Sequence, residues 1–176
     1  MPSPLVVLTG ASGVGKTTIS RALAKGFPEV LVLEADTLKP PSPDFVESIG
    51  PSEGPGGSFQ RSRALFWIGQ VAALLPAGRP ILLDYQCRIA FLQEALSFHA
   101  VTTGKIVLVE CTQHVREARL HGRGSAELAN EQMHNWSRYL QGEAEKAELS
   151  ILDTCELSID ESIRYLIRLL LPDHDA

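Results

Sequence analysis

The stretch LVVLTGASGVGKTTIS, residues 5–20, joins an apolar run to a glycine-rich turn and then to a segment with helical character. Within it, Gly10 to Thr17 match the pattern GxxxxGK[ST] at every position. The glycines let the backbone curl so that successive N–H groups point inward, and a helix over Thr17–Lys25 presents its positive end to the same place. Because the motif follows a strand pattern and precedes a helix pattern, the stretch predicts a phosphate-binding loop.

This loop predicts a nucleotide site with a divalent cation. Lys16 is expected to reach the β- and γ-phosphates, and the hydroxyl group of Thr17 to coordinate Mg²⁺. A glycine-rich turn without any ligand is the alternative, which the complete motif and its strand-to-helix setting disfavour. The residues expected to hold the nucleotide, ATP or GTP, are Gly10, Ser12, Gly13, Val14, Gly15, Lys16, Thr17 and Thr18.

Five short apolar runs alternate with segments of helical spacing. The runs are Pro4–Thr9, Val30–Ala35, Pro80–Tyr85, Lys105–Cys111 and Leu149–Thr154. Runs that are apolar on both faces are typical of parallel strands covered by helices on both sides. One helix is expected directly after the third run, and two more over Phe59–Leu75 and Glu127–Lys146. A last helix is expected to begin at a capping box formed by Ser158 and Glu161 and to end before Pro172. The alternation predicts a three-layer α/β domain with a mostly parallel sheet.

Length and composition limit the classes of protein that fit. A chain of 176 residues is the size of one compact domain, so we expect a single domain over 1–176. A net charge of −5 argues against a nucleic-acid-binding surface. The sequence has no apolar run long enough for a transmembrane helix and no export signal pattern, so we expect a cytoplasmic protein that is not in a membrane. Its three widely spaced cysteines are expected to be buried free thiols. Pro40–Gly57, rich in proline and glycine, is expected to be a loop.

Carboxylates end two of the predicted strands. Ligands gather at the carboxyl ends of parallel strands, so Asp36 is expected beside the phosphate loop, where it could orient a substrate hydroxyl and accept its proton. Capping the next helix is the alternative. Glu34 points to the same side of the strand and could assist in binding substrate. Asp84 is expected to hold a magnesium-bound water, unless it is an ordinary strand-end aspartate. Arg88 is expected either to clamp the substrate or to be solvated.

An arginine cluster follows the fourth apolar run. Arg116 and Arg119 are three residues apart and share a helix face, and Arg123 lies in a turn between two glycines. This turn, at about 121–127, could fold over bound phosphates as a lid. We expect Arg116 to bind nucleotide and Arg119 and Arg123 to neutralise the charge of a transferred phosphoryl group, together with Lys16. Solvated arginines on a helix face are the alternative.

These features together resemble the small P-loop kinases related to gluconate kinase, shikimate kinase, adenylylsulfate kinase and chloramphenicol phosphotransferase. The features are the loop Gly10–Thr18, Asp36 in the turn Ala35–Pro40, and the pattern Arg116-x-x-Arg119-x-x-x-Arg123. The resemblance spans almost the whole chain. It implies a five-stranded parallel sheet in the order 2-3-1-4-5, a mobile lid, and a substrate-closing segment at about 40–75, in which Phe45 to Gln70 would cover the acceptor. The turn Asp84–Arg88 departs from the triple glycine of shikimate kinases, which argues against shikimate as acceptor.

The sequence therefore predicts an ATP- and Mg²⁺-dependent kinase for a small hydroxylated molecule, such as a sugar acid, a nucleoside or an antibiotic. Its partners would be a nucleotide and that acceptor, with a monomer or a homodimer as the assembly. A nucleoside monophosphate kinase is one alternative, although only Arg61, Arg63 and Arg79 lie between the second and third strands. A nucleotide-dependent regulatory switch with little transfer activity is another. No Asn-Lys-x-Asp guanine motif occurs in the sequence.

Overall fold

The computed structural model describes residues 3–37 and 57–172, which form one five-stranded sheet with helices on both faces. The strands are β1 (Leu5–Thr9), β2 (Leu31–Glu34), β3 (Ile81–Asp84), β4 (Gly104–Glu110) and β5 (Ser150–Asp153). The α-helices are α1 (Lys16–Gly26), α3 (Gly57–Leu74), α4 (Ile89–Phe98), α5 (Gln113–Gly122), α6 (Glu131–Lys146) and α7 (Ile159–Leu170). Short 3₁₀ turns lie at Ala35–Thr37, Leu75–Ala77 and Ala126–Leu128.

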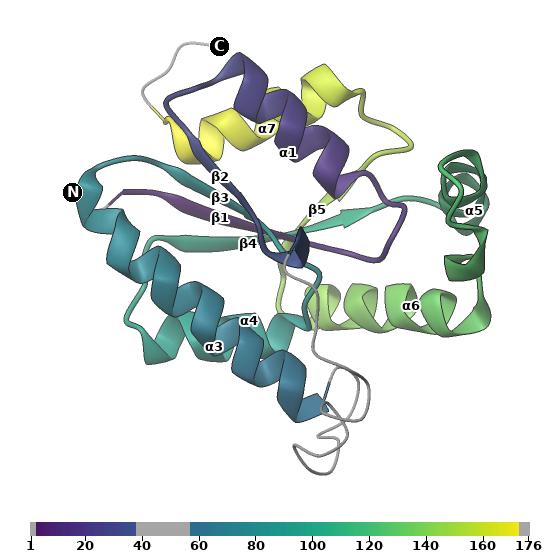
Figure 1. Cartoon of the computed structure of the whole chain (residues 1–176), viewed down its shortest axis with the longest axis horizontal. Helices are drawn as coiled ribbons and strands as arrows, with labels where there is room; N and C mark the ends of the chain where they lie inside the picture. Colours follow the sequence, from purple (N-terminus) through teal and green to yellow (C-terminus); the bar gives the residue numbers. More distant parts are fainter. Residues whose placement is uncertain (1–2, 38–56, 173–176) are drawn as a thin grey trace.

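All four strand pairings are parallel, and the sheet order is β2-β3-β1-β4-β5 (Figure 1). This order confirms the predicted fold class. It places β1 at the centre of the sheet, so the turn after β1 lies between the carboxyl ends of β3 and β4. The connection after β1 runs toward β2 at one edge of the sheet, whereas the connection after the neighbouring strand β3 runs the other way to β4. Ligands bind at such a switch point in sheets of this kind.

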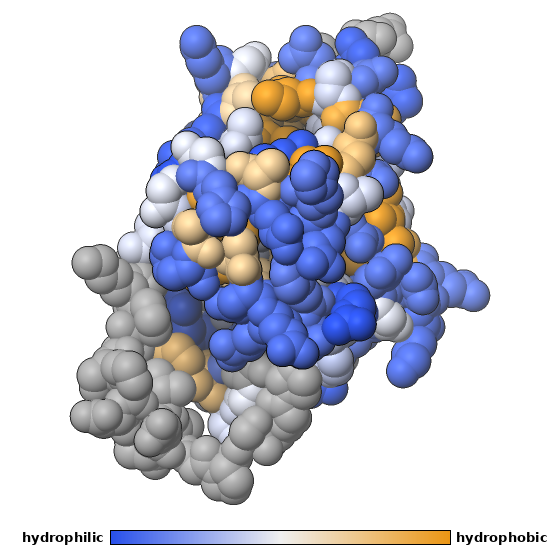
Figure 2. Space-filling model, turned by 90° about the vertical axis from the view of Figure 1, so that its right-hand side faces the viewer, coloured by the Kyte–Doolittle hydropathy of each residue, from blue (hydrophilic) through white to orange (hydrophobic). Residues whose placement is uncertain are grey.

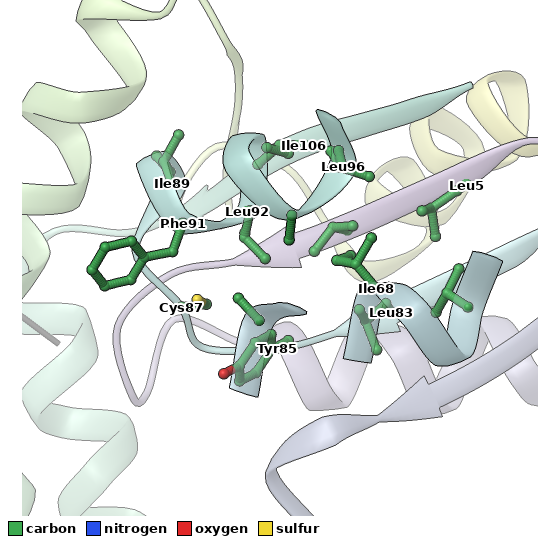
Figure 3. Close-up of a cluster of buried hydrophobic side chains, with 14 of the residues drawn as sticks. Leu5, Ile68, Leu83, Tyr85, Cys87, Ile89, Phe91, Leu92, Leu96 and Ile106 are labelled. Carbon is green, nitrogen blue, oxygen red and sulfur yellow. The ribbon is translucent and has the colours of Figure 1, made fainter. Parts of the chain in front are cut away.

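Alternate residues of the central strands face two separate cores. Val6 and Leu8 point to the side covered by α1 and α7, where they pack with Ile19, Leu23 and Leu166. On the other side Leu5 and Val7 meet α3, α4 and α6. Figure 3 shows this second core, in which Ile68 of α3 and Leu92 of α4 close over Leu5 and Leu83 of the sheet. Central strands that are apolar at every position are thus explained by burial on both faces.

The ends of several elements differ from the predicted ones. The predicted helix Glu127–Lys146 begins four residues later, because Ala126–Leu128 form a separate 3₁₀ turn and the side chain of Asn130 accepts a hydrogen bond from the backbone N–H of Met133 (2.9 Å). Asparagine at this position is a strong helix-capping residue. The predicted capping box of Ser158 and Glu161 is present at the start of α7.

Cys87 and Cys111 are buried as expected, whereas Cys155 is exposed, so the prediction for that thiol was wrong.

Residues 40–56, which belong to the predicted loop Pro40–Gly57 and to the first part of the predicted acceptor-closing segment 40–75, lie outside the described residues. Their continuation from Gly57 is the first turn of α3. Among the helices in residues 3–37 and 57–172, none has both the length and the apolar character needed to cross a membrane.

Candidate active site

The turn after β1 has the backbone shape that the sequence predicts. Gly10 has a φ of 147°, and a Cβ atom there would lie 2.2 Å from the carbonyl oxygen of Val109 in the neighbouring strand β4. Gly13 has a φ of 90°, and its Cβ would lie 2.8 Å from Cγ of Arg116. Glycine is therefore required at both positions, for the backbone angle and for the close approach of neighbouring elements.

Helix α1 presents an open amino-terminal end to this turn. Its cap residue is Gly15 in a left-handed conformation, so no side chain caps the first backbone N–H groups. The first four N–H groups of a helix need partners from outside it, and with the helix dipole they favour an anion. The end of α1 is consequently suited to bind a phosphate.

Lys16 lies within this turn and is almost completely buried. Its Nζ atom donates hydrogen bonds to the carbonyl oxygens of Gly10 (2.7 Å) and Ala11 (3.2 Å). Burial lowers the pKa of Lys16, and the carboxylates of Asp84 and Asp36 act against this shift. The ammonium group is thus held by the loop itself, next to the place where the helix end favours an anion.

Asp84 and Thr17 form a contact between β3 and α1. The hydroxyl group of Thr17 donates to Oδ2 of Asp84 (2.8 Å). Burial raises the pKa of Asp84, while Lys16 and the bond from Thr17 oppose the rise. The other carboxylate oxygen, Oδ1, is buried without a hydrogen-bond partner among the described residues. A buried unpaired carboxylate oxygen needs a compensating partner.

These oxygen atoms fit Mg²⁺. Magnesium prefers oxygen ligands, keeps several of its waters, and is usually bound by one or two protein groups together with substrate phosphates. The Thr17 hydroxyl could be one ligand, and a water held by Asp84 Oδ1 another. In the parts of the chain that the structure describes, no group of three or more His, Cys, Asp or Glu side chains is placed to hold a metal by itself.

Asp36 lies beside the same turn, although it follows strand β2 in the sequence and not β1. It follows that strand in the 3₁₀ turn Ala35–Thr37, and its Oδ2 accepts a hydrogen bond from the backbone N–H of Gln86 (3.0 Å). The side chain of Gln86 in turn accepts a hydrogen bond from Ser12 of the loop (3.1 Å). Gln86 thus connects Asp36 with the loop; sequence analysis assigned it no role, and its place directly after the β3 strand end was the available signal.

A cavity of about 200 Å³, here called the loop cavity, collects these groups. It is lined by residues of the turn, of two strand ends and of the segment after α5: Ser12, Gly13, Gly15, Lys16, Thr17, Thr18, Asp36, Gln86 and Arg123. The structure therefore brings together Lys16, Thr17, Asp36 and Arg123, which sequence analysis had picked out separately.

Arg116 and Arg119 of the arginine cluster contact different parts of the protein. Arg119 donates to the backbone oxygens of Val14 (3.1 Å) and Thr154 (3.0 Å) and to the Thr154 hydroxyl (2.8 Å), so it ties α5 to the loop and to the end of β5. Arg116 is buried and reaches Ser137 (2.8 Å) and His134 (2.6 Å) of α6. Arg116 lines no cavity described here and holds α5 against α6, so the nucleotide contact predicted for it stays a prediction.

Glu34 and Arg88 also have partners elsewhere. Glu34 pairs with Arg21 of α1 through two hydrogen bonds of 2.8 and 2.9 Å, and this pairing lowers the pKa of Glu34. Arg88 pairs with Glu143 of α6 (2.9 Å) and stacks over the ring of Tyr139. Neither residue lines the loop cavity, so the substrate contacts predicted for them stay predictions.

Two larger cavities adjoin the loop cavity. The first, of about 400 Å³ and here called the α5–α7 cavity, shares Gly13, Gly15, Thr18 and Arg123 with it. Its remaining wall comes from α1, α5 and the segment from β5 to α7: Ile19, Arg119, Gly122, Thr154, Leu157, Ile159 and Ser162. Sequence analysis missed Thr154, whose hydroxyl group bridges Arg119 and the backbone oxygen of Val14; its position at the end of the fifth apolar run was the available signal.

The second, of about 560 Å³ and here called the α6 cavity, shares Gln86 with the loop cavity. Its lining residues are Gln60, Gln86, Leu128, Asn130, Gln132, Met133, Asn135, Trp136 and Tyr139. The side of the molecule that carries α5 and α6 is predominantly hydrophilic, with small apolar areas between polar ones (Figure 2).

Comparison with known proteins identifies the family. A family model described as an AAA domain matches residues 5–142, which is most of the chain. Among curated proteins, a guanylate kinase from Thermosynechococcus vestitus is 42% identical over 48 residues. That match covers 27% of this chain and 25% of the enzyme's length, so it spans about a quarter of each protein.

Solved structures of small P-loop kinases share the fold. A sugar kinase from Janibacter superposes with a TM-score of 0.68 at 19% identity, covering 98% of both chains. A tunicamycin resistance protein from Deinococcus radiodurans has a TM-score of 0.65 at 17% identity, covering 94% of both chains. A gluconokinase from Sinorhizobium meliloti has a TM-score of 0.62 at 17% identity, covering 97% of this chain and 93% of its own. These similarities confirm the fold that the resemblance implied.

Proposed function

The chain belongs to the AAA domain family, and from this premise we propose that it is an ATP-dependent kinase that transfers the γ-phosphoryl group to a hydroxyl group of a small molecule. The observation that supports this most is the loop cavity. It brings together the amino-terminal end of α1, the buried Lys16, the hydroxyl group of Thr17 and the carboxylate of Asp36, which follows β2. Phosphoryl transfer depends on positioning and charge stabilisation, and these groups supply both.

The phosphates of the nucleotide would lie in the turn Gly10–Thr17. Backbone N–H groups of the turn and of the first turn of α1 would bind the β-phosphate, and Lys16 would leave the loop carbonyl oxygens to contact the β- and γ-phosphates. Thr17 and Asp84 would hold Mg²⁺, which when bound neutralises charge on the phosphate oxygens. The nucleoside would extend into the α5–α7 cavity, where Arg119 is fixed by Thr154.

Asp36 is proposed to orient the acceptor and take its proton. The acceptor oxygen forms a bond to the γ-phosphorus while the bond from that phosphorus to the oxygen of the β-phosphate breaks, and ADP leaves with the bonding electrons. The hydroxyl proton passes to a carboxylate oxygen of Asp36, whose other contact is the N–H of Gln86. Arg123, which also lines the loop cavity, would stabilise charge on the transferred group.

A nucleoside monophosphate kinase is the second candidate, and the partial similarity to a guanylate kinase is the observation that favours it. In such an enzyme the acceptor phosphate needs cations around it. The arginines between β2 and β3 are already engaged: Arg61 pairs with Glu94, Arg63 donates to the carbonyl oxygen of Ala35, and Arg79 donates to those of Pro28 and Glu29. This arrangement favours a hydroxyl acceptor without a phosphate.

The remaining proposals concern the state of the protein. We propose that residues 1–176 act as a single kinase-like domain in the cytoplasm, as a monomer or a homodimer, and that residues 121–127 and 40–75 close over the nucleotide and the acceptor. ATP is the proposed donor.

The test is ADP release from ATP and Mg²⁺ across a panel of sugar acids, nucleosides, nucleotides and antibiotics, with Lys16→Met as the blank. One compound that raises the rate well above background in the wild type alone supports the kinase. A flat panel from a protein that binds nucleotide would support a regulatory switch with little transfer activity instead.

A further inference from the structure

We infer that the α6 cavity is the acceptor site and that it takes an uncharged polar molecule with an apolar or aromatic face, such as a nucleoside or a glycoside, in preference to a carboxylate or a phosphate ester. The inference rests on the proposed kinase function and specifies its substrate class. It follows from the position of the cavity, from the uncharged chemistry of its described wall, and from the pairing of Arg88 with Glu143.

The position fits an acceptor. Gln86 lines both the α6 cavity and the loop cavity, and its backbone N–H is bound to Asp36. A molecule in the α6 cavity can therefore present a hydroxyl group past Gln86 to the carboxylate of Asp36. The α5–α7 cavity, which Arg119 and Arg123 line, is the proposed site of the nucleoside, so the α6 cavity remains for the second substrate.

The wall of the α6 cavity is formed by side-chain amides and aromatic rings, with no charged residue among its described members. The amide oxygens of Gln60 and Gln86 accept hydrogen bonds from the backbone N–H of Arg88 and from the hydroxyl group of Ser12, so their NH₂ groups remain to donate to a ligand. Asn135 and Gln132 of α6 add two further amides. Amide groups can donate to and accept from hydroxyl groups but provide no full charge.

The aromatic part of the wall is a stacked pair. The rings of Trp136 and Tyr139 lie 5.8 Å apart at an angle of 13°. Both are held on the surface of α6, and Tyr139 is fixed by a hydrogen bond to Glu143 (3.0 Å). Rigid aromatic faces next to amide groups favour flat or ring-shaped ligands that are polar at their edges.

The arginine nearest to Gln86 in the sequence is paired with a carboxylate. Arg88, the arginine closest in sequence to Gln86, is bound to Glu143 and lies over Tyr139. Arg138 of α6 donates to Oδ1 of Asn135 and is exposed. An anionic ligand would lose hydration on entering the α6 cavity, whose described wall offers amides but no cation, and this opposes its binding.

The experiment uses the full chain with ATP, Mg²⁺ and a low-molecular-weight cell extract from which nucleotides have been removed. Mixed-bed ion exchange divides the extract into an uncharged flow-through fraction and a charged fraction that is eluted with salt. Phosphoesters formed in each are measured by mass spectrometry, with Lys16→Met as the blank. We expect at least about tenfold more Lys16-dependent phosphoester from the uncharged fraction.

Phosphoesters formed mainly from the charged fraction would overturn the inference while leaving the kinase function intact. Product from neither fraction would refute the kinase function itself, and the inference with it. These two failures are therefore distinguishable.

A matched pair of variants then tests the site. With the acceptor found in this way, Asn135→Ala should raise KM for the acceptor about threefold to tenfold and leave kcat nearly unchanged. This is expected when a variant loses a hydrogen bond that stabilises the bound substrate and the transition state equally. Glu145→Ala, exposed on the same helix but outside the cavity, should change neither value. Equal behaviour of the two variants would show that the acceptor binds elsewhere.

Discussion

Replacing Gly13 by alanine tests how α5 packs against the phosphate loop. At Gly13 the φ of 90° alone should cost about 1–2 kcal/mol for any residue with a Cβ atom. The added methyl group would also lie 2.8 Å from Cγ of Arg116 and 2.9 Å from Cγ of Leu120, both in α5. Leu120 is fully buried, so relieving the contact should cost about 1–3 kcal/mol more.

Gly78→Ala is the matched control. Gly78 has a φ of 82°, and a Cβ there would meet no atom within 4 Å, so only the backbone cost applies. For a chain of this length 1 kcal/mol corresponds to a shift of roughly 2–4 °C in Tm. The Tm of Gly13→Ala should therefore lie about 2–12 °C below that of Gly78→Ala, measured by circular dichroism and checked by urea unfolding. Equal Tm values would refute the packing of α5 on the loop.

Three further predictions concern the chemistry. Lys16→Met should abolish turnover, because the variant loses a contact to the phosphates. Its far-ultraviolet circular dichroism spectrum should stay unchanged, because no core packing is lost. Unchanged activity would refute the role of the loop. Asp36→Asn should lower kcat at least about a hundredfold, as for loss of a catalytic base, whereas an effect on KM alone would leave Asp36 a binding role. Asp84→Asn should raise the Mg²⁺ concentration for half-maximal turnover about 10–100-fold, since a ligand-orienting carboxylate is lost. An unchanged Mg²⁺ requirement would remove Asp84 from the metal site.

The fold could be predicted from the sequence because the patterns that indicate strands, helices and the phosphate loop are local. The alternation of buried runs with helical segments is fixed by periodicity, and the loop pattern at Gly10–Thr17 places the first crossover. Ligand-binding residues gather at the carboxyl ends of parallel strands, so Asp36 and Asp84 are expected near that loop, although they come 19 and 67 positions after Thr17 in the sequence.

Other parts depend on how helices dock, which periodicity does not encode. Arg88 and Glu143 lie 55 residues apart, and no pattern near Arg88 in the sequence predicts that its partner is an acidic residue of α6. Arg116 and Arg119 are both on α5, yet one reaches α6 and the other reaches Thr154, because each extends to a different neighbour. The amide-rich wall of the α6 cavity likewise arises only when α6 packs beside the segment after β3.

The central claim is that the γ-phosphoryl group of ATP passes to an organic hydroxyl group. It is tested most directly by following [γ-³²P]ATP with Mg²⁺ and the best acceptor, and by separating organic phosphoester from inorganic phosphate. The account predicts one labelled ester for each ADP formed, little inorganic phosphate, and no product with Lys16→Met. Label found only in inorganic phosphate, at a rate that no acceptor changes, would contradict it.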